Sequence, residues 1–137
     1  MNLKRVVWLF AIIAVSGQAY AQTSSCPKPA DIKHSRMDIG GFSYVADGPL
    51  DQKWTGQNEH AEEANMESLV FKEASYKARD DGVNSMSSVF CDYHGSGSFA
   101  VRLVLKPVHD FDRAADTLWK DNHCKDNDRL KCSFNHQ

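Results

Sequence analysis

Apolar and polar residues alternate along Phe42–Asp47, with Phe42, Tyr44 and Ala46 on one side of the alternation. A period of two residues is typical of a β-strand that buries one face. The sequence Asp47-Gly48-Pro49 that follows favours a turn. We therefore predict a strand over 42–47 that buries those three apolar side chains.

A second pattern predicts a β-hairpin later in the chain. Ser88–Tyr93 has the composition of a strand, and Phe99–Leu105 alternates again until Pro107 ends it. The connection His94–Ser98 is short and glycine-rich, as hairpin loops are. One face of the second strand would bury Phe99, Val101, Leu103 and Leu105.

Three other segments are less regular. We predict a short strand near Ala30–Ser35 and an irregular stretch at Trp54–Gly56. The segment Ala61–Ala78 is compatible with a helix or a strand, because helix formers are followed by residues that suit a strand. Within it we favour a strand over Ser68–Tyr76, which the Asp80-Asp81-Gly82 sequence would close as a turn.

The period changes near the C-terminus. Between Asp110 and Trp119 apolar residues recur with the spacing of one helical face, and Asp110 is available as the helix cap. These residues are Phe111, Ala114, Ala115, Leu118 and Trp119. We therefore predict a short C-terminal helix with Trp119 in the core, followed by a polar tail that a disulfide would order.

Together these elements predict a β-rich, α+β domain. A small antiparallel sheet with the C-terminal helix on its face satisfies the burial of both apolar surfaces. A small β-sandwich or a partly open barrel is the alternative architecture.

The first 21 residues have the three parts of a secretory signal. Lys4 and Arg5 are followed by the apolar run Val6–Val15 and then by Ala19-Tyr20-Ala21, which has small residues where a signal peptidase reads. The apolar run is about half the length of a transmembrane helix. We expect cleavage after Ala21, a single domain over 22–137, no membrane span in the mature form, and a periplasmic or secreted protein.

Four cysteines lie beyond the predicted cleavage site: Cys26, Cys91, Cys124 and Cys132. An even number of cysteines in an exported domain is typical of disulfides. Sequence allows three pairings, and we prefer Cys26–Cys91 with Cys124–Cys132. A thiolate metal site is the rival interpretation, although it would need clustered cysteines and no C-x-x-C pair is present.

The charge of the mature chain narrows the class of partner. Removal of Lys4 and Arg5 leaves 14 basic and 18 acidic residues, a net charge of −4. Nucleic-acid binding is disfavoured, because an acidic chain without a basic cluster does not attract a phosphate backbone. The chain also lacks a cationic amphipathic stretch, so we do not predict binding to a membrane surface.

No catalytic motif stands out. The chain lacks the serine-hydrolase elbow, the zinc-protease helix, the Walker loop and the dinucleotide fingerprint. No two of the six histidines have a spacing that places both imidazoles on one helix or strand face. A catalytic triad could still assemble in space around His94 or His109. We therefore predict no cofactor and no metal, and assign no catalytic residue.

Loop residues with aromatic or polar side chains are the candidates for binding. We select Trp54, Thr55, His94 and Ser96 as the candidate binding surface, because amphipathic aromatics suit protein or glycan partners. Two loops, Gly95–Ser98 and Trp54–Gln57, are candidates to enter the cleft of a partner enzyme.

Several short sequences together resemble a family of small exported proteins of Gram-negative bacteria, known as a domain of unknown function. They are Cys26-Pro27, Trp54-Thr55-Gly56, Phe90-Cys91-Asp92-Tyr93, Leu103-Val104-Leu105, Trp119, and Cys124 with Cys132-Ser133-Phe134. The resemblance implies a periplasmic or secreted location and a compact β-rich domain. It supplies no catalytic residues.

The sequence thus favours a non-catalytic binding module that recognises a protein or glycan of the envelope or host. The alternatives are an inhibitor of a secreted hydrolase such as a lysozyme or protease, a small hydrolase, and a metal-binding protein. The inhibitor hypothesis rests on analogy between small disulfide-bonded β domains.

Overall fold

The computed structural model describes residues 21–137. The predicted signal peptide therefore lies outside the described residues, apart from Ala21. Within residues 21–137 the regular secondary structure is mostly β-strand, arranged as two antiparallel sheets and joined by loops and three short 3₁₀-helices. The predicted β-rich class is confirmed.

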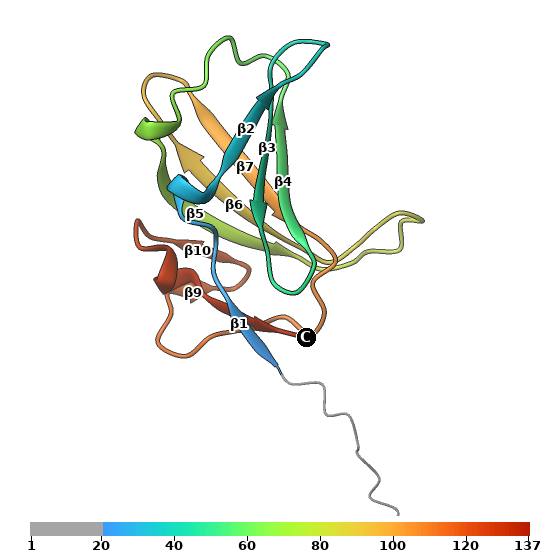
Figure 1. The fold of residues 1–137 in the computed structure, drawn as a ribbon. Helices are drawn as coiled ribbons and strands as arrows, with labels where there is room; N and C mark the ends of the chain where they lie inside the picture. The colour runs from blue at the N-terminus through green and yellow to red at the C-terminus, as the bar shows by residue number, and fades with distance from the viewer. Residues whose placement is uncertain (1–20) are drawn as a thin grey trace, which may run out of the picture.

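The larger sheet has eight strands in the order β2-β3-β4-β7-β6-β5-β10-β9 (Figure 1). Their bounds are β2 Lys33–Arg36, β3 Phe42–Asp47, β4 Lys53–Asn58, β5 Val70–Lys77, β6 Ser88–His94, β7 Ala100–Leu105, β9 Trp119–Lys120 and β10 His123–Lys125. The sheet ends on β2 at one edge and on β9 at the other, so it does not close into a barrel.

The smaller sheet joins the two ends of the described chain. Its order is β1-β11-β8, with β1 Gln22–Ser24, β11 Phe134–His136 and β8 Asp112–Arg113. Three short 3₁₀-helices connect strands elsewhere, at Pro29–Asp31, Met66–Ser68 and Arg129–Cys132. None of the described helices has the length and apolar character needed to cross a bilayer.

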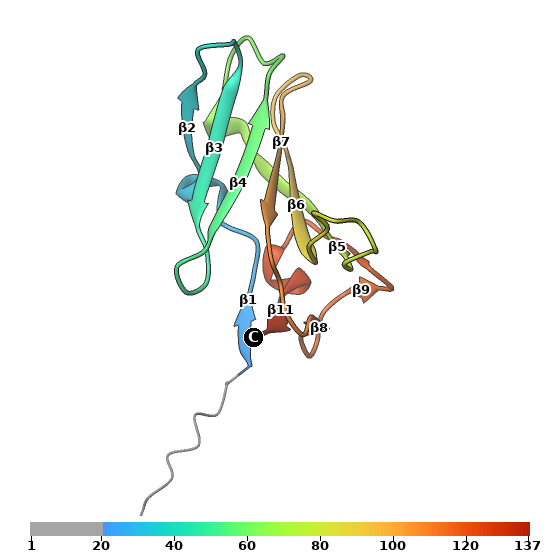
Figure 2. The same cartoon turned by 90° about the vertical axis from the view of Figure 1, so that its right-hand side faces the viewer.

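The large sheet bends between β4 and β7, and its two halves turn toward each other (Figure 2). Only one residue pair, Thr55 with Val104, is in register across this junction. Gly56 lies beside it, and a side chain there would collide with the Arg102 carbonyl oxygen. The absence of a Cβ at Gly56 therefore lets the two backbones approach at the bend.

The structure confirms the strands with the most regular patterns. Phe42, Tyr44 and Ala46 of β3 are buried, as the alternation predicts. Strands β6 and β7 form the predicted hairpin, and Val101, Leu103 and Leu105 point into the core. The ambiguous segment Ala61–Ala78 contains β5, close to the bounds that we favoured.

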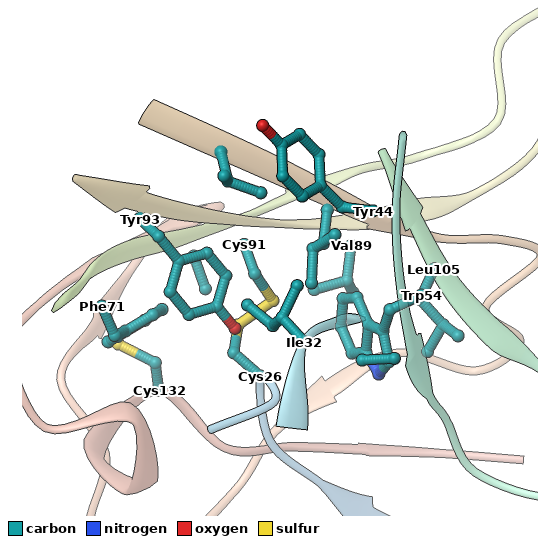
Figure 3. Packing of buried hydrophobic residues seen from close by; sticks show 14 of the residues in the cluster. Cys26, Ile32, Tyr44, Trp54, Phe71, Val89, Cys91, Tyr93, Leu105 and Cys132 are labelled. Carbon is teal, nitrogen blue, oxygen red and sulfur yellow. A yellow bond between two sulfur atoms is a disulfide. The ribbon is translucent and has the colours of Figure 1, made fainter. Parts of the chain in front are cut away.

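The core lies between the two halves of the sheet (Figure 3). Trp54 and Tyr44 extend from one half toward Val89 and Tyr93 of the other. The Tyr93 hydroxyl donates a 2.6 Å hydrogen bond to the carbonyl oxygen of Pro27, so its polar atom is satisfied inside the core.

Both disulfides have the pairing that the sequence analysis preferred. Cys26–Cys91 crosses the core from the N-terminal segment to β6, with Cα atoms 5.8 Å apart. Cys124–Cys132 closes the tail, with Cα atoms 5.6 Å apart. All four cysteines are fully buried, so both bonds are parts of the packed interior.

The predicted C-terminal helix is wrong. Asp110 and Asp116 have positive φ angles of 51° and 60°, which interrupt a right-handed helix. The backbone N–H groups of Ala114 and Leu118 donate to carbonyls of the tail instead of to a preceding turn. Long-range pairing therefore replaces the helix, because a segment of this length gains little from helical bonds alone. The prediction that Trp119 is a core residue is confirmed.

Candidate functional site

Two of the four residues proposed as a binding surface come from β4, and one of them is not on the surface. Trp54 is only 1% exposed and its ring lies edge-on to Phe134, with centroids 6.4 Å apart. Thr55 is exposed on the opposite face of the strand. The predicted irregular stretch at Trp54–Gly56 is therefore a strand, and the prediction that Trp54 lies on the surface is wrong.

One of the two segments that we predicted to be loops able to enter a partner's cleft is therefore not a loop. Trp54–Gln57 lies wholly inside β4, paired with β3 along its length. A segment fixed by neighbours on both sides cannot extend into a partner. The other predicted loop, Gly95–Ser98, is a true connection between β6 and β7.

His94 and Ser96 lie together at the end of the β6–β7 hairpin, and both are exposed. Thr55 is farther away. Thr55 pairs with Val104, whereas His94 pairs with Ala100. These two positions of β7 are separated by about 13 Å along the strand. The structure thus brings His94 and Ser96 into one site and leaves Thr55 outside it.

The loop beside His94 is held by hydrogen bonds to the loop that precedes β5. The Ser96 backbone N–H donates to the Ser68 hydroxyl at 2.9 Å, and that hydroxyl donates to the Asn65 carbonyl at 2.7 Å. The Asn65 amide donates to the Ser96 hydroxyl at 3.2 Å. Within the hairpin loop, the Gly95 N–H donates to the Phe99 carbonyl at 2.7 Å. We call these two loops, residues 58–69 and 94–100, the loop-end site.

Two open cavities meet at the loop-end site. The first has a volume of about 760 Å³ and is lined by both loops and by the start of β5, including His94, Val70 and Lys72. The second, of about 520 Å³, is lined by Asn58, His60, Ala61, Glu62, Glu63 and Asn65 together with the hairpin loop. Ser96, Ser98 and Phe99 line both cavities, so the hairpin loop is the wall between them.

A buried phenol lies behind this wall. The Tyr44 ring is 6.5 Å from the Phe99 ring, and its hydroxyl has no hydrogen-bond partner among the described residues. Burial raises the pKa of Tyr44 above its ordinary value. The phenol therefore stays neutral and acts as a packing group of the core behind Phe99.

A cross-strand ion pair lies on the outer face of the same hairpin. Arg102 donates two hydrogen bonds to the Asp92 carboxylate, at 2.7 and 2.9 Å, and its guanidinium lies 5.3 Å from the centre of the Phe90 ring. The hydrogen bond with Asp92 raises the pKa of Arg102. This bidentate pair fixes the register of β6 on β7 and leaves half of the arginine side chain in solvent.

Among residues 21–137, one serine and one histidine side chain are hydrogen-bonded to each other, and this contact is not at a cavity. The Ser24 hydroxyl and His136 Nε2 are 2.7 Å apart, where β1 pairs with β11. His136 is 1% exposed, and neither residue lines any of the five cavities described. Neither His94 nor His109 contacts a serine or a carboxylate among the described hydrogen bonds.

Residues 21–137 contain no group of three or more histidine, cysteine or acidic side chains placed to hold a metal ion. The four cysteines are bonded to one another. The arrangement at the loop-end site can donate and accept hydrogen bonds through hydroxyl, amide and imidazole groups.

The β5–β6 loop over Ala78–Ser87 is the most prominent surface feature, and the sequence patterns did not predict it. It extends away from the body of the protein (Figure 1), and Val83 at its end is 97% exposed. The Asp80 carboxylate accepts from the Gly82 N–H at 2.8 Å, and the Ser85 hydroxyl accepts from the Asp80 N–H at 2.9 Å. The Asp80-Asp81-Gly82 sequence signalled a turn but gave no measure of how far the loop extends.

Comparisons with known proteins give a family and no relative of known activity. A search of the curated proteins and a search of the solved structures each return no significant match. The model of a family described as "protein of unknown function (DUF3757)" matches residues 21–135, which is most of the chain. The resemblance to a family of unknown function is thus confirmed, and the chain belongs to DUF3757.

Proposed function

We propose that this protein is an exported, non-catalytic binding module that recognises a protein or glycan of the envelope or host through the loop-end site. The proposal includes removal of the signal peptide after Ala21 and a periplasmic or secreted location. Two buried disulfides and a fold without a membrane-spanning helix among the described residues are compatible with export.

The observation that supports this function is the preformed junction between the two cavities. Ser68 and Asn65 hold the Ser96 loop in place before any partner arrives. A loop that is already ordered loses little conformational entropy on binding, and this raises affinity for a given contact area. The exposed serine hydroxyls and His94 supply polar contacts, while Phe99 and Val70 supply apolar ones.

The scaffold supports the same interpretation. The two halves of the large sheet form a sandwich-like arrangement with a common core, and the Cys26–Cys91 disulfide joins the N-terminal segment to it. Loops at the end of such a scaffold can vary in sequence without disturbing the core.

The test compares two arginine substitutions at opposite ends of β6. Ser98→Arg places a long charged side chain between the two cavities, and Val83→Arg places the same side chain on the β5–β6 loop. Oxidised mature protein and both variants serve as bait in envelope and culture-supernatant fractions. Both positions are exposed, so we expect both variants to fold, and thermal unfolding of each bait checks this.

We expect a specific partner that is retained by the Val83→Arg bait and lost by the Ser98→Arg bait. A partner retained equally by both variants would place binding elsewhere on the protein. Well-folded bait that captures nothing from either fraction would contradict the binding function.

A second candidate function, inhibition of a secreted hydrolase, is favoured by the β5–β6 loop. Its backbone is held by hydrogen bonds to Asp80, Ser85 and Ser87, and its apolar end residue Val83 is fully exposed. A projecting rigid loop can enter a cleft more readily than a flat surface can. Activity assays of lysozymes and proteases with the wild type and Val83→Arg test it. Inhibition that the substitution removes would establish this function in place of the first.

A further inference from the structure

A third group of side chains lies far from the loop-end site, on the β9–β10 hairpin. Cys124 pairs with Trp119 in this hairpin, and His123 pairs with Lys120. Cys124 and Trp119 point into the core, so the residues that alternate with them face outward. Lys120, His123 and Lys125 consequently share the outer face of one short hairpin.

These three side chains surround a cavity of about 590 Å³. Its other lining residues are Thr117, Leu118 and Trp119, and none of the six lining residues is acidic. Because the Trp119 side chain points into the core, Leu118 supplies the exposed apolar surface. Leu118 is 48% exposed, which leaves its side chain available to a ligand. Cavities that combine an apolar surface with a few polar groups are typical of small-molecule sites.

The cavity is fixed in shape by the core beneath it. The Leu118 backbone N–H donates to the Lys131 carbonyl at 2.9 Å, and the Trp119 indole N–H donates to the Ser133 carbonyl at 2.9 Å. The Cys124–Cys132 disulfide joins the hairpin to the same tail. The hairpin backbone around the cavity is therefore held in place without a ligand.

The charges around the cavity favour an anion. Lys120 and Lys125 contribute two positive charges to the lining, and His123 adds hydrogen-bonding capacity. Four acidic residues lie nearby but none of them lines the cavity: Glu73 is opposite Lys125 on β5, Asp116 precedes Thr117, Asp121 is in the hairpin turn and Asp126 follows Lys125. A ligand seated on Leu118 thus contacts cationic groups before acidic ones.

We propose that this cavity binds a single-chain anionic amphiphile, with its apolar chain on Leu118 and the aliphatic parts of the lysine side chains and its carboxylate or phosphate headgroup between Lys120 and Lys125. This site shares no residue with the loop-end site. The proposal goes beyond the proposed function and does not depend on it.

The test uses dodecanoate as the probe, below its micelle concentration, with the oxidised mature protein. Isothermal titration calorimetry gives the affinity, and the backbone amide resonances of Leu118 and Lys120 report the place of binding. Dodecyltrimethylammonium has the same chain with the opposite charge, and acetate has the headgroup without the chain. The variants are Lys120→Gln/Lys125→Gln and a matched control, Lys33→Gln/Lys106→Gln, which removes two exposed lysines elsewhere.

We expect dodecanoate to bind at one site and to shift the amide resonances of Leu118 and Lys120. The Lys120→Gln/Lys125→Gln variant should bind it about tenfold more weakly, while the control variant is unchanged. Equal binding of dodecyltrimethylammonium, or an unchanged affinity in the first variant, would overturn the proposal. Binding to phosphatidylglycerol vesicles without binding of dodecanoate would also overturn it, in favour of a membrane surface.

Discussion

Phe111 stacks face to face on Tyr76, with ring centroids 4.0 Å apart and planes 3° apart. The same ring meets Trp119 edge-on at 5.2 Å and stacks on Phe134 at 5.7 Å. Phe111 thus joins β5, the β9 strand and the C-terminal strand β11. This aromatic cluster therefore packs residues 111–119 against strands that are distant in the chain.

Replacing Phe111 with alanine should lower the free energy of unfolding by about 2–3 kcal/mol, because a half-buried ring and its aromatic contacts are lost. Urea denaturation measures the change. The matched variant Tyr76→Phe keeps a stacked ring and should change stability by less than about 0.5 kcal/mol. A small effect of Phe111→Ala would show that the cluster does not hold the segment.

This cluster also explains why the sequence predicted a helix incorrectly. Phe111 and Trp119 have a helical spacing, but their partners, Tyr76 and Phe134, are distant in the chain. Strands β3, β6 and β7 were predictable, since alternation and a short loop are local signals. The pairing of β8 with β11 depends on long-range contacts that no local pattern reveals.

Burial lowers the pKa of His136 below its ordinary value, whereas a hydrogen bond with the Gln137 backbone acts in the opposite direction. The unfolded chain therefore takes up a proton at a higher pH than the folded protein does. The contribution of neutral His136 to the free energy of unfolding should be fully present above about pH 6.5. It should be lost as the pH drops below that value, toward the folded-state pKa.

Chemical denaturation at pH 7.5 and at pH 5.5 measures this loss, with His136→Gln as the comparison. Glutamine cannot take up the proton but can still hydrogen-bond to Ser24, 2.7 Å from Nε2 in the wild type. The stability of the His136→Gln variant should therefore depend less on pH over this range than that of the wild type. An equal dependence in both proteins would assign the effect to other groups.

The bend of the large sheet predicts a contrast between two glycines. Gly56→Ala should cost more than about 2 kcal/mol, because its Cβ would meet the Arg102 carbonyl at the junction of β4 and β7. Gly97 has a φ of 62° and open space around it, so Gly97→Ala should cost about 1 kcal/mol of backbone strain. Thermal unfolding compares them, and similar losses would contradict a tight junction at Gly56.

The two disulfides should contribute unequally to stability. Their loops span 65 and 8 residues, which correspond to about 4 and about 2.5 kcal/mol of chain entropy. The Cys124→Ser/Cys132→Ser variant should thus remain folded, but with a loosened β9–β10 hairpin. Denaturation gives the loss of stability, and hydrogen exchange locates it. Loosening confined to β6 would contradict the expectation that the Cys124–Cys132 disulfide stabilises the β9–β10 hairpin.

The candidate site was only partly predictable. His94 and Ser96 were found because a glycine-rich hairpin loop must be exposed. Trp54 was misplaced because neighbouring polar residues hid its strand, and its buried face appears only when β3 pairs with β4. The cationic cavity combines lysines that look dispersed in sequence, and only the register of β9 on β10 brings them to one face.

Site-specific photocrosslinking in the native host tests the binding function most directly. A photoreactive phenylalanine analogue at Ser98 lies between the two cavities of the loop-end site, and one at Leu50 lies on the exposed β3–β4 turn. We predict a discrete adduct from position 98 that position 50 does not give and that His94→Ala weakens. No adduct from position 98, or the same adduct from both positions, would contradict the loop end as the binding surface.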